Sequence, residues 1–263
     1  MEEDNILEVR DLKVWFPIKK GIFSRTGGHV KAVDGVSFDL HCGETLGVVG
    51  ESGSGKSTVA RVITGLQKPT EGSFKLNGKV AMVFQDPLGS LNPRMTVRAT
   101  LEGAVLSESR VLCLRSKVLP EKDFRRETED ASKLLELVGL DSSALDKYPH
   151  EFSGGQRQRI CIARAIAAKP ELLICDEAVS ALDLSIRAQM LDLLEDLKKK
   201  LGLSLLFITH DLGVVQHIAD RILVMNRGKI IEEGPCGQVL KAPREEYTRY
   251  LISSVPKIGK PLT

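Results

Sequence analysis

The stretch GESGSGKS, which begins at Gly50, has the residue types needed to hold a chain of phosphates. It follows an apolar run that predicts a buried strand and opens a run that predicts a helix, which is the context in which GxxxxGK[ST] binds phosphate. Glycines at Gly50, Gly53 and Gly55 let the backbone wrap a phosphate with its N–H groups pointing inward. Lys56 would bring positive charge to the outer phosphates, and Ser57 a hydroxyl ligand for Mg²⁺. The stretch predicts a nucleoside triphosphate site.

Polar side chains also end three other apolar runs of the sequence. Asp176 and Glu177 follow LLIC, Gln85 ends AMVFQ, and His210 lies in FITHD. Beside a phosphate loop, Asp176 suits a magnesium partner and Glu177 suits the orientation and deprotonation of the attacking water. His210 could contact a γ-phosphate, and Gln85 could contact Mg²⁺ or the water. A structural histidine and a simple strand cap are the alternatives for these two residues.

A second stretch, EFSGGQRQR, has the composition of a helix N-terminus that can receive an anion. Ser153, Gly154 and Gly155 precede a run that predicts a helix, and they leave backbone N–H groups open to close approach. One nucleotide needs only one phosphate loop. The sequence therefore raises the question of what this second site binds.

The elements that must position these residues alternate between strands and helices along the chain. Apolar and alternating runs predict strands over 6–16, 32–40, 44–50, 79–85, 170–177 and 204–211, and a hairpin over 221–234 that turns at 226–228. Helical periodicity predicts helices over 56–65, 128–139, 155–168, 184–201 and 212–219. Such alternation is typical of a mostly parallel sheet with helices on both faces, and ligands gather at the carboxyl ends of its strands.

Composition excludes several other classes of protein. The 263 residues include 37 basic and 35 acidic ones, and this near-balance argues against a dedicated nucleic-acid binder. No apolar run approaches the roughly 20 residues of a membrane span, and the acidic start MEEDNILEVR does not resemble a signal peptide. The scattered cysteines form no CxxC pair, which favours reduced thiols; they are Cys42, Cys113, Cys161, Cys175 and Cys236. We expect a cytoplasmic protein.

Taken in order, the phosphate loop, Gln85, SGGQ, the DE pair, SALD and His210 resemble the ATP-binding-cassette (ABC) ATPases over roughly residues 6–235. The resemblance implies an α/β fold: a P-loop NTPase core with a mostly parallel sheet, an N-terminal antiparallel β region and an inserted α-helical subdomain at approximately 86–168. It also implies ATP and Mg²⁺ as cofactors. Phe152 stands where the family usually has leucine.

The resemblance assigns roles residue by residue. The catalytic set is Glu177, His210, Lys56 and Gln85, and the metal set is Ser57, Gln85 and Asp176. The nucleotide-binding set is Phe16, Gly50, Glu51, Ser52, Gly53, Ser54, Gly55, Lys56, Ser57, Thr58, Gln85, Ser153, Gly154, Gly155, Gln156, Asp183 and His210. Phe16 is the expected aromatic partner of adenine, with Trp15 as the alternative because the stretch 17–30 blurs the register.

Finer details resemble the ATPase subunits of dipeptide, oligopeptide and nickel importers. They include MVFQDPLGSLNPRMTV, YPHEFSGGQRQRI and the tail APREEYTRYLISSVP. We expect an ABC ATPase domain over 1–240 and a short importer-type tail over 241–263. The segment EGSFKLNGKVAMVFQ is abbreviated beside relatives, which should shorten a surface strand or connection. Residues 86–94 are expected to form a mobile loop. Because Cys236 is the only cysteine after Cys175, no iron–sulfur cluster is expected.

This resemblance implies partners as well. A second ABC ATPase, identical or homologous, and separate permease chains are expected, with a substrate-binding protein acting indirectly and no nucleic acid. The subunit would lie peripherally on the cytoplasmic face of the cell (inner) membrane. The rival is a non-transport ABC ATPase of DNA repair, chromosome maintenance or translation. It is disfavoured because only 97 positions without sustained heptads separate Lys56 from Ser153, and because the chain has a single cassette.

Overall fold

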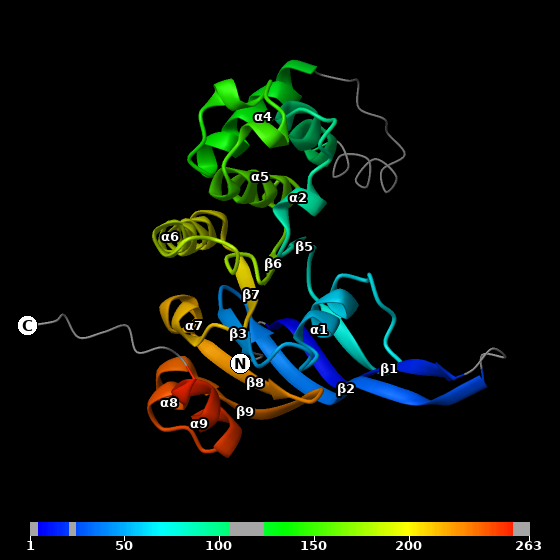
Figure 1. Ribbon diagram of the computed structural model, residues 1–263. Coiled ribbons are helices and arrows are strands. Elements are labelled where there is room, and N and C mark those ends of the chain that lie inside the picture. Colours follow the sequence, from blue (N-terminus) through cyan, green and yellow to red (C-terminus); the bar gives the residue numbers. More distant parts are fainter. Residues whose placement is uncertain (1–4, 21–24, 106–123, 255–263) are drawn as a thin grey trace, which may run out of the picture. The chain divides into compact units, whose positions relative to one another are not determined.

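The computed structural model describes residues 5–20, 25–105 and 124–254, and Figure 1 shows their helices and strands. The chain divides into two compact units. One combines Met1–Asn77 with Ser204–Thr263, and the other is Gly78–Leu203. Among the described residues, no helix is both long and apolar enough to cross a membrane.

The first unit contains an antiparallel sheet of β1 (Asn5–Lys20), β2 (Arg25–His41) and β4 (Glu71–Leu76), in the order β2-β1-β4. Alternate apolar residues of β1 and β2 are buried, as a half-buried sheet requires. Both strands continue past the predicted 6–16 and 32–40, into the stretch 17–30. Strand β4 was not predicted, because most of its residues are exposed and it has no apolar pattern of its own.

The second sheet of this unit has the order β7-β3-β8-β9, with β7 (Ser204–Thr209), β3 (Thr45–Val49), β8 (Arg221–Asn226) and β9 (Lys229–Pro235). β3 pairs in parallel with β7 and β8, and β8 and β9 form the predicted hairpin. Its turn has φ of 47° at Arg227 and 79° at Gly228. Two positive values in a row are typical of the type I′ turn that matches strand twist.

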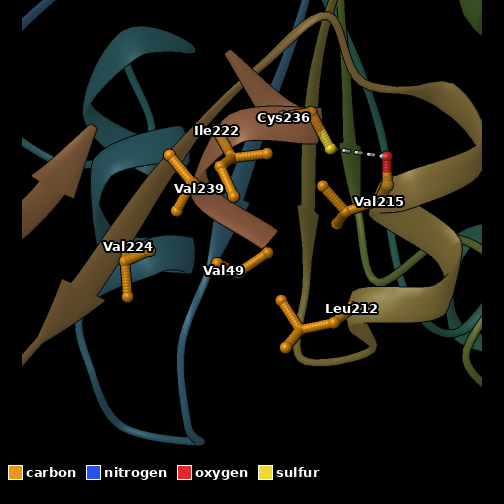
Figure 2. Packing of buried hydrophobic residues seen from close by; sticks show 7 residues of the cluster. All are labelled: Val49, Leu212, Val215, Ile222, Val224, Cys236 and Val239. Carbon is orange, nitrogen blue, oxygen red and sulfur yellow. Dashed lines mark hydrogen bonds between the residues drawn. The ribbon is translucent and has the colours of Figure 1, made fainter. Parts of the chain in front are cut away.

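Helices α1 (Lys56–Ile63), α7 (Leu212–Ile218), α8 (Cys236–Lys241) and α9 (Glu246–Ser253) complete the first unit. A buried cluster joins β3, β8, α7 and α8, and Figure 2 shows its members Val49, Leu212, Val215, Ile222, Val224, Cys236 and Val239. The thiol of Cys236 donates to the Val215 carbonyl oxygen at 3.7 Å. Burial raises the pKa of this thiol. Cys236 is therefore a neutral core residue.

The second unit has the parallel strands β5 (Val80–Val83) and β6 (Leu172–Asp176) and a set of helices. These are α2 (Pro87–Ser90), helical residues 97–105, α4 (Phe124–Leu137), η1 (Ser142–Ala144), η2 (Pro149–Glu151), α5 (Gly154–Ile166) and α6 (Leu184–Leu201). Within the stretch expected as a loop, α2 forms one helical turn. Proline suits its first position, where no N–H is needed.

Candidate nucleotide site

The predicted phosphate loop, called the P-loop below (residues 50–58), joins β3 to α1 in the first unit. Gly50 has φ of 154° and Gly55 has φ of 107°, values that side chains rarely adopt. A Cβ at Gly50 would collide with the Met225 carbonyl oxygen, and one at Gly55 would collide with that of Ala32. The two glycines therefore allow the loop to pass between β2 and β8.

Lys56 turns back into this loop. Its ammonium donates to the carbonyl oxygens of Gly50 at 2.7 Å and Glu51 at 2.8 Å, and to Ser54 Oγ at 3.2 Å. The residue is only 4% exposed. A buried cation must be well partnered, and here three oxygens of the same loop surround it. The P-loop and its lysine thus form one folded structure that carries positive charge.

The hairpin β8–β9 supports the P-loop from outside. Gly228 donates its N–H to the Ser54 carbonyl at 2.9 Å, and the Gly228 carbonyl accepts from the Asp34 N–H at 2.8 Å. The sequence predicts a turn at Gly228 but not the contact of that turn with the P-loop, because local turn residues do not encode distant contacts. The structure thus ties the loop to both sheets of its unit.

His210 follows β7, at the same edge of the sheet as the P-loop. Thr209 pairs with Val49, the residue before Gly50, so the two strand ends lie side by side. His210 is exposed, and Asp211 caps the next helix by accepting the Gly213 N–H at 2.9 Å. The first unit therefore brings a histidine to the edge where the P-loop begins.

The two candidates for the adenine partner differ in their surroundings. Phe16 is 40% exposed and pairs with Val30, two residues from Ala32, whose carbonyl borders Gly55. The Trp15 ring has the Lys31 ammonium 4.9 Å from its centroid. A cation over its face makes Trp15 a member of a surface cluster, whereas Phe16 has a ring open to solvent beside the strand that borders the P-loop.

In the second unit, Gln85 and Asp176 lie at the carboxyl ends of neighbouring strands. Val83 of β5 pairs with Cys175 of β6, which places Gln85 and Asp176 just beyond one pair. Gln85 is exposed and Asp176 is buried. Complete burial raises the pKa of Cys175 to about 12, with a smaller contribution from Asp176, so the thiol stays neutral. The carboxylate and amide oxygens are hard donors of the kind Mg²⁺ prefers.

Glu177 has a backbone conformation that is uncommon for its residue type. Its φ is 50°, in the left-handed region. Its carbonyl accepts two hydrogen bonds from Ser180, one from the N–H at 3.1 Å and one from the hydroxyl at 2.9 Å. Strained residues of this kind cluster at functional sites, where the surrounding structure holds them. The SALD segment thus fixes the turn that carries Glu177.

The SGGQ motif forms the start of α5. The Ser153 hydroxyl accepts the Gln156 N–H at 3.3 Å, and Gln156 Oε1 accepts the Ser153 N–H at 3.0 Å. A Cβ at Gly155 would lie 2.7 Å from Ile186 Cγ2, whereas nothing lies within 4 Å of one at Gly154. Gly155 therefore permits close packing on α6, and Gly154 keeps the exposed face of the motif open.

Asp183 is the N-terminal cap residue of α6, and its carbonyl accepts the Arg187 N–H at 2.8 Å. Arg187 also directs its guanidinium to the carbonyls of Ser180 and Leu182 at 3.4 and 3.3 Å. Sequence reasoning missed Arg187. The only available signal was an arginine one helical turn after Asp183, which occurs in many surface helices.

Comparison with known proteins identifies the family to which this chain is similar. A sequence model described as ABC transporter matches residues 33–180. The oligopeptide transport ATP-binding protein AppF of Bacillus subtilis is 47% identical over 98% of this chain and 80% of its own length. The dipeptide transport ATP-binding protein DppF of Escherichia coli is 45% identical over 97% of this chain and 77% of its own length.

A solved structure extends the likeness to the fold. The ATP-binding cassette MJ0796, a dimer in a post-hydrolysis state bound to ADP and Pi, superposes with a TM-score of 0.71. Its sequence is 26% identical, over 88% of this chain and 98% of that one. The order of motifs, the mostly parallel strands and the antiparallel N-terminal sheet all agree with such a cassette. This chain belongs to the ABC transporter family and is a nucleotide-binding ABC ATPase.

Proposed function

We propose that this chain is the ATP-hydrolysing subunit of a peptide importer. The observation that carries the proposal is the 45–47% identity to AppF and DppF over nearly the whole chain. Peptides of dipeptide or oligopeptide length would cross the membrane through separate permease subunits. A substrate-binding protein would deliver the peptides to these permeases. The ATPase would lie peripherally on the cytoplasmic face of the membrane.

In this proposal the P-loop binds the phosphates of ATP and Phe16 stacks on adenine. The buried Lys56 ammonium lies among the loop carbonyls, from which it would turn to a bound phosphate. His210, at the adjoining strand end, contacts the γ-phosphate. Charge that develops on the transferred phosphoryl group is stabilised by these donors, which is the main source of catalysis in phosphoryl transfer.

Ser57, Gln85 and Asp176 are the proposed magnesium ligands. A hydroxyl, an amide oxygen and a carboxylate fit this ion, which selects hard oxygen donors. When bound, Mg²⁺ neutralises charge on the β- and γ-phosphates. Glu177 is the proposed general base, and the turn closed by Ser180 holds its backbone in place.

The second anion site is proposed to serve a partner cassette. The segment Ser153–Gln156, with Asp183, would complete the nucleotide site of a second ABC ATPase, identical or homologous. Two observations support this: the exposed face of the motif and the dimeric state of MJ0796. In the proposed division of the chain, the helical subdomain within 1–240 receives the permease, and residues 241–263 are the importer-type tail.

The first test of this proposal is Glu177→Gln, which removes the base while preserving the shape of the side chain. We expect ATP turnover to fall by about 10²- to 10⁴-fold with ATP binding retained. The matched control, Glu136→Gln on the exposed face of α4, should turn over normally. Normal turnover in Glu177→Gln would exclude Glu177 as the base.

The transport role is tested by isolating the native complex from membranes. We expect two permeases and a second ATPase to co-purify with this chain, and reconstituted vesicles to take up labelled peptides in an ATP-dependent way. Uptake of nickel instead of peptides would contradict the substrate class. Co-purification of DNA or ribosomes would overturn the transport role altogether.

A further inference from the structure

The C-terminal helix α9 packs on the elements that carry the P-loop. Tyr247, Leu251 and Ile252 are partly buried against the cluster of β3, β8, α7 and α8. That cluster includes Val49, the last residue of β3 before the loop. A segment near the end of the chain thus shares a core with the strand that leads into the nucleotide site.

Tyr247 also contacts the P-loop directly. Its hydroxyl accepts the Glu51 N–H at 3.1 Å. The Glu51 carbonyl accepts hydrogen bonds from the Lys56 ammonium at 2.8 Å and from the Ser54 N–H at 3.2 Å. The backbone of Glu51 is therefore held by the tail at its N–H and by the phosphate-binding lysine at its carbonyl. Tyr247 and Lys56 are connected through one residue.

The start of α9 is fixed by a buried carboxylate. Glu232 on β9 accepts the N–H groups of Arg244 at 2.8 Å and Glu245 at 3.1 Å. Arg244 and Glu245 lie three and two residues before Tyr247, so these bonds hold the start of the helix that carries its ring. Arg249 closes the same turn by donating to the Pro243 carbonyl at 3.3 Å. These contacts hold the Tyr247 hydroxyl at a defined position.

Packing alone does not account for the tyrosine. A buried apolar residue would fill the same space, but it would leave the Glu51 N–H without this acceptor. Burial raises the pKa of Tyr247, which keeps the phenol neutral at physiological pH. Tyr250, on the same helix with its ring centroid 6.4 Å away, is 56% exposed, and among the described residues the side-chain hydrogen bonds that its carbonyl accepts come from Ser253 and Ser254, not from the P-loop. The two tyrosines therefore form a natural pair for comparison.

We propose that Tyr247 is a positioning residue of the nucleotide site. With α9 docked, its hydroxyl holds the backbone of Glu51, and so steadies the loop from which the Lys56 ammonium would reach the phosphates. Because coupling between two sites is reciprocal, bound nucleotide in turn stabilises the docked helix. The inference rests on the proposed function, since it takes the P-loop as the ATP site.

The experiment compares Tyr247→Phe with Tyr250→Phe in the full chain, using a fluorescent ATP analogue. Loss of one hydrogen bond predicts an increase of about fivefold in the dissociation constant of Tyr247→Phe, because such a bond contributes about 1 kcal/mol. The KM for ATP should rise with it, while kcat at saturating ATP changes less. Tyr250→Phe should match the wild type. Equal affinity in Tyr247→Phe and the wild type would overturn the proposal.

Amide hydrogen exchange distinguishes this role from a purely structural one, in which ATP would not change the exchange rates of α9. ATP should slow exchange of the α9 amides in the wild type and should slow it less in Tyr247→Phe. Leu251→Ala loosens the helix without removing the hydroxyl and should weaken ATP binding in the same direction. Amide exchange of α9 that ignores ATP in the wild type would contradict the coupling.

Lys56→Ala distinguishes a failure of the P-loop assignment from a failure of the role proposed for Tyr247. If that variant binds ATP as the wild type does, the P-loop assignment itself fails. If Lys56→Ala loses binding while Tyr247→Phe and Leu251→Ala bind normally, only the role of Tyr247 fails. A thermal unfolding midpoint of Tyr247→Phe close to that of Tyr250→Phe shows that the folded state is intact in the comparison.

Discussion

Two helices of this protein begin with serine and glycine, and they begin in opposite ways. Helix α1 starts after Gly55 in a left-handed conformation, without a side-chain cap, and its first residue is a buried lysine. Helix α5 starts after Ser153 in an extended conformation and closes a reciprocal capping box with Gln156. The P-loop is held by tertiary contacts from β2, β8 and the tail. The SGGQ motif is held by hydrogen bonds between its own residues.

This difference corresponds to two uses of a helix N-terminus. The P-loop, the proposed phosphate-binding element, is held in shape by its own unit through Gly50, Gly55 and Glu51. The SGGQ motif is exposed at Ser153, Gly154 and Gln156, and its serine and glutamine side chains cap the helix that it begins. We interpret the first as a complete binding element and the second as a contribution to a site elsewhere, as the proposed dimer requires.

The largest effect is expected where the P-loop meets its neighbours. Gly55→Ala would place a Cβ against the Ala32 carbonyl at φ of 107°. Strain and the forced shift should lower the free energy of unfolding by about 2–4 kcal/mol. ATP binding should be lost with it. Chemical denaturation and ATP titration measure both effects.

Gly154→Ala is the matched change in the other helix. Its Cβ would meet nothing within 4 Å. The free energy of unfolding should therefore stay within about 0.5 kcal/mol of the wild type, as for an ordinary surface substitution. ATP affinity of the isolated chain should not change. If Gly154→Ala abolished that affinity, the two helices would serve one site in the same chain, and the comparison would fail.

A smaller effect is expected at Phe16, the proposed adenine partner. Phe16→Ala removes an exposed ring beside the strand that borders Gly55, and aromatic stacking on a base is worth about 1–3 kcal/mol. ATP affinity should fall accordingly, with folding little changed. Trp15→Ala is the control, because the Lys31 ammonium lies over that ring. The reverse result would assign adenine to Trp15.

How far the sequence predicts these features depends on how local they are. The strand ends that carry Gln85, Asp176 and His210 follow from apolar runs, and the turn at Gly228 follows from its residue types. The contact of Tyr247 with Glu51 joins residues 196 positions apart, and no local pattern encodes it. Helices α8 and α9 were missed for a related reason: each is short and takes its stability from packing on the sheet.

The tail offers a pH-dependent way to sharpen the comparison. Burial opposes ionisation of Glu232, but the hydrogen bonds from the Arg244 and Glu245 amides and the charge of Arg244 lower the pKa from the usual 4.5. A lowered folded-state pKa stabilises the fold above pH 4.5, and this contribution is lost as the pH falls through the folded-state value. Acidification should therefore release α9.

Glu232→Gln tests this anchor. The amide offers one oxygen and a donor where two N–H groups need acceptors, so the free energy of unfolding should fall by about 1–3 kcal/mol at pH 7. The difference from wild type should shrink below pH 4.5. Glu246→Gln, an exposed change in the first turn of the same helix, is the control. A constant difference at every pH would show that the charge of Glu232 is not what holds the tail.

A small loss of stability is expected at the cap of α5. Ser153→Ala removes the acceptor of the Gln156 N–H and should lower the free energy of unfolding by about 1 kcal/mol. Because the motif is proposed to act on a partner's nucleotide, ATP affinity of the isolated chain should be unchanged, while turnover of the assembled transporter falls. Ser153→Asp separates the two roles, since aspartate also caps a helix but repels phosphate. It should restore stability without restoring turnover. Recovery of both by aspartate would mean that Ser153 only caps α5, and the second anion site would lose its functional meaning.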